Sequence, residues 1–259
     1  MSGQQSPHHY SLRPSERRML AQADLIFWVG PTMESFMPRI LDSLKNKQSS
    51  IALIETQNLK LLPLRQTGHD HGGHDHDDHG HDNAEKKHAK IDPHFWLNTH
   101  NADVLVDAIS QKIIQLDPEH KEQYLSNSQQ LHQQIAQLRK KLHSSLNMVK
   151  KPFLTYHDGY QYFEDEFNLD NAGFIATSEL QPSARRIAEL KTLIQQQNIE
   201  CIFYDAPTKP TILKSLLANA KTNTFMLDPV GLLITRSKNA WFEIMQLLNR
   251  QFIKCQQNL

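Results

Sequence analysis

The sequence predicts an α/β protein of two lobes, each with a parallel sheet, joined by one long connecting helix. Strand-like segments alternate with segments of helical periodicity in both halves of the 259 residues. This alternation is typical of parallel strands linked by right-handed crossover helices. A helical stretch without glycine, and with proline only at its start, separates the halves, and the length suffices for two domains.

These patterns divide the chain into three parts. We expect an N-terminal lobe over residues 1–116, a connecting helix over 117–150 and a C-terminal lobe over 151–259. Pro118 can open the connecting helix at its first turn. At ~1.5 Å per residue, the helix would be roughly 50 Å long, enough to cross a domain.

The first half is expected to contain helices and strands in alternation. Pro14 and Ser15 predict a short helix with Ser15 as N-cap, ending near Ala23. The following elements are expected to be a strand at 25–29, a helix at 33–44, a strand at 51–54 and a helix at 101–115.

The second half alternates more regularly. We expect strands at 153–156, 173–177, 202–204 and 224–227, and helices at 159–167, 183–197, 210–220 and 239–254. Ligands of such sheets bind beyond the carboxyl ends of the strands. This rule selects His157 and Asp228, because each directly follows a predicted strand.

Composition excludes several classes of protein. The 28 basic and 28 acidic side chains give no net charge, which disfavours nucleic acid as a partner. No segment approaches the roughly 20 apolar residues that span a membrane, and no export signal is visible at the start. Cys201 and Cys255 are too far apart for a metal knuckle and could form a disulfide or remain two buried thiols.

Histidine is unusually frequent, with 15 residues, and many lie in one tract at 68–90. This tract has too few apolar residues to form a core, so we expect it to be disordered without a ligand. It is either a solvated linker or an accessory loop that binds several zinc ions weakly, and we favour the loop. The accessory candidates are His69, His71, His74, His76, His79 and His81. His88 in the flank of the tract, and His100, His120, His132 and His143 elsewhere, are expected to face solvent.

Four residues are candidates for one metal site. Three imidazoles and a carboxylate would form a tetrahedral site of the kind that zinc accepts. Taken singly, His8 could be a surface residue, His94 could be a core histidine, and Asp228 could be a turn residue. The candidates are His8, His94, His157 and Asp228.

The four candidate ligands lie in the motifs Pro7–Ser15, Asp92–Leu97, Thr155–Phe163 and Leu227–Gly231. Two further segments, Ala23–Pro31 and Met33–Phe36, lie between the first two motifs. Together, in this order and along nearly the whole chain, these motifs resemble those of the zinc- and manganese-binding solute-binding proteins of bacterial ABC transporters.

The resemblance implies a function and a site. It implies zinc capture in the periplasm and delivery to the membrane permease of a zinc ABC transporter, without enzymatic activity. It implies ligation by His8, His94 and His157, with Asp228 as fourth ligand or as a neighbour that competes with water. The tract is typical of the zinc-transporting branch, and some relatives have a disulfide where Cys201 and Cys255 lie. We expect a monomer.

Two departures from the family pattern have consequences. Relatives begin with a signal peptide followed by a strand, a helix and a strand, which this sequence lacks. We therefore expect a truncated chain whose first lobe lacks its leading strands. Pro7 stands where some zinc relatives have glutamate, so a carboxylate contact from that position is not expected.

The metal and the function each have alternatives. Manganese relatives tend to replace the third imidazole by a carboxylate, so His157 favours zinc, although copper or nickel could bind more tightly. The alternative functions are manganese or other divalent-metal binding within the same family, and a zinc store or adhesin. A zinc hydrolase fits less well, because no HExxH motif is present and nothing in the spacing of Glu164 or Glu179 makes either a general base.

Overall fold

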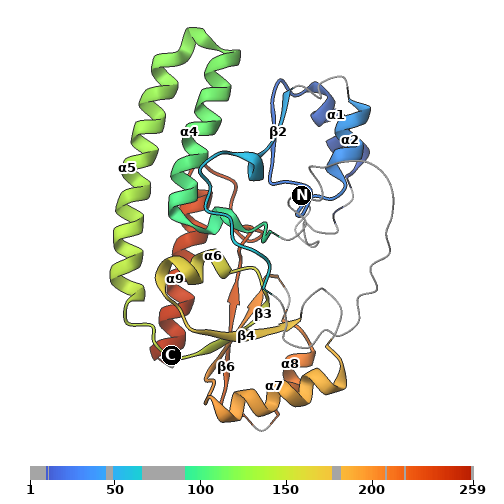
Figure 1. Cartoon of the computed structure of the whole chain (residues 1–259), viewed down its shortest axis with the longest axis vertical. Coiled ribbons are helices and arrows are strands. Elements are labelled where there is room, and N and C mark those ends of the chain that lie inside the picture. The colour runs from blue at the N-terminus through green and yellow to red at the C-terminus, as the bar shows by residue number, and fades with distance from the viewer. Residues whose placement is uncertain are drawn as a thin grey trace. The chain divides into compact units, whose positions relative to one another are not determined.

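A computed structural model describes residues 10, 12–44, 49–65, 91–176, 182–207, 209–218 and 220–257 of the chain (Figure 1). His8 and the tract at 68–90 lie outside these residues. The chain divides into two compact units, one of residues 5–133 and one of residues 1–4 and 134–259. The predicted α/β architecture with parallel sheets and one long helix is confirmed.

The described part of the unit at residues 5–133 contains a two-stranded parallel sheet. Strands β1 (Ile26–Trp28) and β2 (Ser50–Ala52) pair over three residues each. Its remaining elements are α1 (Pro14–Gln22), α2 (Met37–Ser43), η3 (Leu53–Glu55), η4 (Phe95–Leu97), α4 (Thr99–Leu116) and η5 (Pro118–His120). A small buried core joins α2 to the sheet through Ile26, Met37 and Leu41.

A close backbone approach requires the glycine that follows β1. Gly30 has φ +148°, and a Cβ there would lie 2.7 Å from Cγ2 of Ile54. No other residue adopts this conformation without strain. The turn is held by Glu34, which accepts the Gly30 N–H at 3.1 Å.

Two helix starts differ from those expected. Helix α1 begins at Pro14 with Arg13 as N-cap, not with Ser15, because Glu16 accepts the Arg13 N–H at 2.9 Å. Helix α2 begins at Met37 instead of Met33, because residues 31–36 form turns before it.

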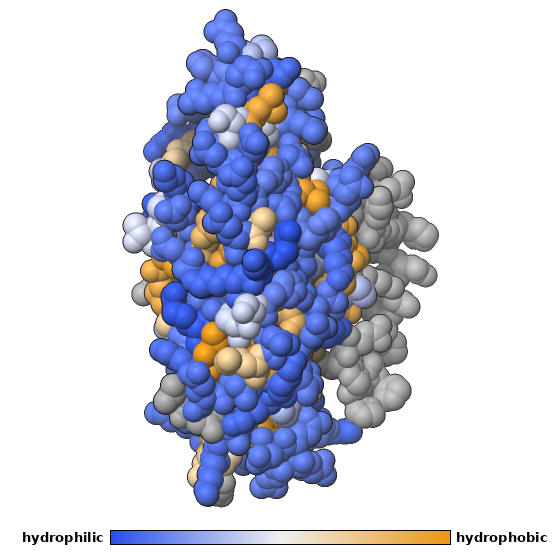
Figure 2. Space-filling model, turned by 90° about the vertical axis from the view of Figure 1, so that its left-hand side faces the viewer, coloured by the Kyte–Doolittle hydropathy of each residue, from blue (hydrophilic) through white to orange (hydrophobic). Residues whose placement is uncertain are grey.

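Helix α5 (Lys121–Leu146) contributes residues to both units, and the short helix η5 precedes it. The face shown in Figure 2 is the side on which α5 lies in Figure 1, and hydrophilic residues cover most of it. The buried residues of α5 are all apolar and lie toward its end: Ile135, Leu138, Leu142 and Leu146.

The expectation that His132 faces solvent is wrong. Its imidazole on α5 bridges two carboxylates of α4, with Nδ1 3.0 Å from Asp103 and Nε2 2.9 Å from Asp107. The hydrogen bond to Asp103 raises the pKa of His132, and Asp107 raises it further, while burial opposes the shift. Both ring nitrogens can donate only when the imidazole is protonated.

We therefore expect the bridge to stabilise the protein at acidic pH and to be lost as pH rises through the raised pKa of His132. His132→Gln should lower the free energy of unfolding by up to about 1 kcal/mol near pH 6, since the pair is partly exposed, and by less near pH 8.5. Urea unfolding at both values measures this, with His100→Gln, an exposed histidine of α4, as the control. An equal loss at both values would contradict the bridge.

The unit at residues 134–259 contains a four-stranded, fully parallel sheet. The strand order is β4 (Asn171–Ala176), β3 (Phe153–His157), β5 (Cys201–Asp205) and β6 (Asn223–Leu227). The helices that alternate with these strands are α6 (Gln161–Phe167), α7 (Ala184–Gln196), α8 (Ile212–Leu216) and α9 (Ala240–Gln257). All four strands and all four helices lie where the sequence predicts them, although α8 is shorter than expected.

Apolar side chains cover both faces of this sheet. Alternate strand residues point to opposite faces, so Leu154 and Phe153 belong to different cores. One core joins the sheet to α7 and α8 (Leu154, Ile175, Leu190, Ile194, Ile202, Leu213 and Leu216). The other packs aromatic rings of the sheet against α6 and α9 (Phe153, Phe163, Phe203 and Phe252).

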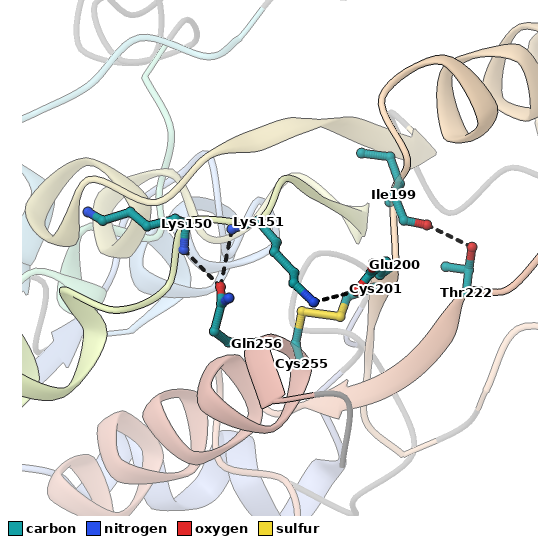
Figure 3. Close-up of a disulfide and its surroundings, with 8 residues drawn as sticks. All are labelled: Lys150, Lys151, Ile199, Glu200, Cys201, Thr222, Cys255 and Gln256. Atoms are coloured by element: carbon teal, nitrogen blue, oxygen red, sulfur yellow. Dashed lines mark hydrogen bonds and ion pairs between the residues drawn. A yellow bond between two sulfur atoms is a disulfide. The ribbon is translucent and has the colours of Figure 1, made fainter.

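A disulfide between Cys201 and Cys255 confirms the pairing that the family resemblance implies. It joins the first residue of β5 to the end of α9, and both residues are buried (Figure 3). Beside it, the Gln256 side chain accepts the N–H groups of Lys150 and Lys151. The amino end of the sheet is therefore covalently tied to its covering helix.

Candidate metal site

The carboxyl ends of three neighbouring strands bring polar residues to one edge of the four-stranded sheet. In the register of β3 with β5, Thr155 lies opposite Phe203, so His157 and Asp205 end their strands at the same level. Asp205 in turn pairs with Leu227 of β6, which Asp228 follows. Two of the predicted ligands, His157 and Asp228, therefore belong to one sheet edge, as expected for parallel strands.

His157 is accessible at this edge, because its side chain is 32% exposed. Its Nδ1 lies 3.9 Å from Oδ2 of Asp205. This separation is longer than a hydrogen bond but close enough for an electrostatic contact. The arrangement allows a ligand to reach the imidazole.

Asp228 is completely buried and holds the turn that follows β6. Its two carboxylate oxygens accept the backbone N–H groups of Leu232 and Leu233, each at 2.8 Å. Asp228 thus acts as a turn residue here. Each carboxylate oxygen has more than one acceptor position, so the same group can still bind a cation.

A buried tyrosine lies beneath the edge. Tyr160 precedes α6, is 1% exposed and donates its hydroxyl to Oδ1 of Asp205. Burial raises its pKa well above that of a free tyrosine, and the negative charge of Asp205 adds to this effect. The phenol therefore remains protonated and keeps donating at physiological pH.

His94 lies in the other unit, directly before η4. It is 3% exposed, and its Nδ1 lies 2.7 Å from Oδ1 of Asp92, which also accepts the His94 backbone N–H. An ionised carboxylate can only accept hydrogen bonds, so Nδ1 of a neutral His94 must carry the proton and donate to Asp92. Its Nε2 is then the nitrogen that can bind a metal.

The structure brings only some of the predicted ligands together. Within the described ranges, no group of three or more His, Cys, Asp or Glu residues is arranged to hold a metal ion. Of the four predicted ligands, His8 is outside those ranges, as are all six tract histidines and Glu179. Glu164, the other conceivable base, is buried and its Oε1 accepts the amide of Asn171 at 2.7 Å.

Sequence reasoning missed the residues that surround the two histidines: Asp92, Tyr160 and Asp205. The signal for Asp205 was present, because it directly follows the predicted strand 202–204, just as His157 follows 153–156. Tyr160 lies within the motif Thr155–Phe163, but it is not among the predicted ligands. No pattern in the sequence shows that its hydroxyl reaches a residue on β5.

Comparison with known proteins identifies similar chains. The sequence model of the family described as "Zinc-uptake complex component A periplasmic" (ZnuA) matches residues 1–255. The high-affinity zinc uptake system protein ZnuA of Brucella abortus (strain 2308) is 36% identical over 254 residues, covering 89% of this chain and 76% of that protein. The ZnuA protein of Yersinia pestis is 30% identical, covering 96% of this chain and 81% of that protein.

Solved structures show the same fold. The zinc-bound crystal structure of a ZnuA deletion mutant has a TM-score of 0.77 at 19% identity, covering 99% of this chain and 87% of that one. The solute-binding protein FpvC of Pseudomonas aeruginosa in complex with Mn²⁺ has a TM-score of 0.76 at 18% identity, covering all of this chain and 88% of that one.

Proposed function

Because this chain belongs to the family of periplasmic zinc-uptake components A, we propose that it captures zinc with high affinity in the periplasm. It delivers the ion to the membrane permease of an ABC transporter. The observation that carries this proposal is the family match over residues 1–255, which contains all four ligand motifs. Members of this family are transport components and not enzymes. Among the described residues, no helix is long and apolar enough to cross a membrane.

The proposed zinc ligands are His8, His94 and His157, with Asp228 as a fourth ligand or as a neighbour that competes with water. Two features of the described residues support this set. His157 is accessible at the sheet edge where parallel sheets bind ligands. The Asp92 carboxylate beside Nδ1 of His94 favours the tautomer in which Nε2 is the metal-binding nitrogen.

Imidazole donors favour zinc over manganese, which prefers oxygen ligands. The Mn²⁺ complex of FpvC makes manganese binding the second candidate function. Equilibrium titration with each ion, under competition from a chelator of known affinity, separates the two. The proposal predicts that the chain binds zinc far more tightly than manganese. If manganese binds more tightly, manganese and not zinc is the transported ion.

We also propose roles for the parts between the ligand motifs. The tract at 68–90 acts as an accessory loop whose histidines collect zinc weakly. The helix expected over 117–150 connects the lobes 1–116 and 151–259, since α5 contributes residues to both compact units.

Asp92 offers a direct test of how His94 is prepared for zinc. Asp92→Asn replaces an acceptor by an amide that can donate to Nδ1, which would place the proton on Nε2 and block the metal-binding nitrogen. We expect zinc affinity to fall about 10–100-fold, the usual cost of losing such a partner. Asp107→Asn, an exposed change in the same unit, is the control for zinc titration. Equal affinities in wild type and Asp92→Asn would contradict this role.

A further inference from the structure

Asp205 faces the predicted ligand His157 from the neighbouring strand and is itself held by a buried tyrosine. We propose that Asp205, fixed by Tyr160, is a positioning residue that orients the imidazole of His157 for zinc. This inference rests on the proposed function. It assigns a role to two residues that are not among the proposed ligands.

The backbone fixes this pair of residues. His157 and Asp205 are the last residues of β3 and β5, and the ladder between these strands runs through Phe153, Leu154 and Thr155. Both strands are buried on both faces over their first three residues. The side chains at the ends therefore project from rigid elements, which suits a preorganised metal site.

The charge of Asp205 selects one form of the imidazole. Its Oδ2 lies 3.9 Å from Nδ1 of His157, so the negative charge favours a proton on that nitrogen. A neutral imidazole with its proton on Nδ1 has its lone pair on Nε2. A carboxylate placed beside the other nitrogen of a ligand histidine is a recurrent feature of zinc sites, where it fixes the tautomer and the ring orientation.

Tyr160 determines where the charge of Asp205 lies. Its hydroxyl donates to Oδ1, which leaves Oδ2 on the side of His157. The tyrosine is almost completely buried, so it cannot move away without opening the core. Asp205 is only 25% exposed at its side chain, which limits screening of its charge by solvent.

The other unit also has a carboxylate beside Nδ1 of a histidine, but at hydrogen-bond distance. There Oδ1 of Asp92 lies 2.7 Å from Nδ1 of His94. Both described histidines of the predicted ligand set thus have a carboxylate beside Nδ1. This repetition in two units, on unrelated local structures, supports positioning as the shared role.

The test compares the full chain carrying Asp205→Asn with a matched control, Glu200→Gln. Glu200 directly precedes β5 at its opposite end, forms an ion pair with Lys151 at 2.6 Å and is 28% exposed at its side chain. Both substitutions remove one partly exposed carboxylate near the same strand. A third variant, Tyr160→Phe, removes only the hydroxyl that donates to Asp205.

Two readouts are needed. Competition titration with zinc should show a dissociation constant raised about 10–100-fold for Asp205→Asn, a smaller rise for Tyr160→Phe and no change for Glu200→Gln. In zinc-free protein near pH 8, ¹⁵N shifts of the His157 ring should show the proton on Nδ1 in wild type and a shift toward Nε2 in Asp205→Asn. His157→Gln identifies the signal.

The outcomes separate this inference from the proposed function. Wild-type affinity and tautomer in Asp205→Asn would overturn the positioning role, and so would a lost affinity with an unchanged tautomer. If wild type itself fails to bind zinc, the proposed function fails. The tautomer of the metal-free protein still decides whether Asp205 orients His157.

Discussion

His157→Ala is expected to weaken zinc binding by more than about 100-fold, because loss of a direct ligand should exceed the 10–100-fold cost of losing an outer partner. His157 ends β3 at the ligand-binding edge of the sheet and is accessible there. Competition titration with a chelator of known affinity measures the loss. Thermal unfolding of the zinc-free variant checks that the fold is retained.

Two comparisons make this prediction specific. His143→Ala removes an exposed imidazole from α5, which packs on Phe167, and should leave zinc affinity unchanged. Deleting residues 69–81 should cost far less affinity than His157→Ala. The reverse order would mean that the tract, and not the four ligand motifs, is the main zinc site.

Removing the disulfide should have the largest effect on stability. The bond closes a loop of 54 residues between β5 and the end of α9. In the chain-entropy model, a loop of this length stabilises the folded state by about 4 kcal/mol. We expect the double variant Cys201→Ser, Cys255→Ser to lose about this amount in the free energy of unfolding. Urea unfolding followed by circular dichroism measures it.

The same variant separates stability from zinc binding. The disulfide lies at the first residue of β5, whereas Asp205 and the proposed ligands His157 and Asp228 lie at the opposite, carboxyl edge of the sheet. While it remains folded, the variant should therefore bind zinc with wild-type affinity. If the variant and the oxidised wild type unfold at the same urea concentration, the disulfide does not have the stabilising role expected here.

The sequence predicted the second lobe well because its strands are short apolar runs separated by clear helices. It failed at helix starts where a side chain decides the cap. Glu16 accepts the Arg13 N–H and so moves the cap of α1 away from Ser15. Such contacts depend on rotamers, which propensity alone does not determine.

Contacts between distant residues also escaped prediction. Nothing in the spacing of His132 shows that its ring lies between Asp103 and Asp107, because this depends on how α4 and α5 pack. The same holds for Tyr160 and Asp205, which are 45 residues apart. The candidate ligands could be predicted from sequence motifs. The carboxylate beside His157 could be identified only once the register of β3 and β5 was known.

The central claim is that the four ligand motifs, and not the tract, hold zinc tightly. Its most direct test is the metal content of the purified chain, with and without residues 69–81, by elemental analysis after extensive dialysis. The account predicts about one zinc ion retained per chain in both proteins, as a closed site with protein ligands would hold. Loss of the retained zinc on deletion of the tract, or no retained zinc in either protein, would contradict it.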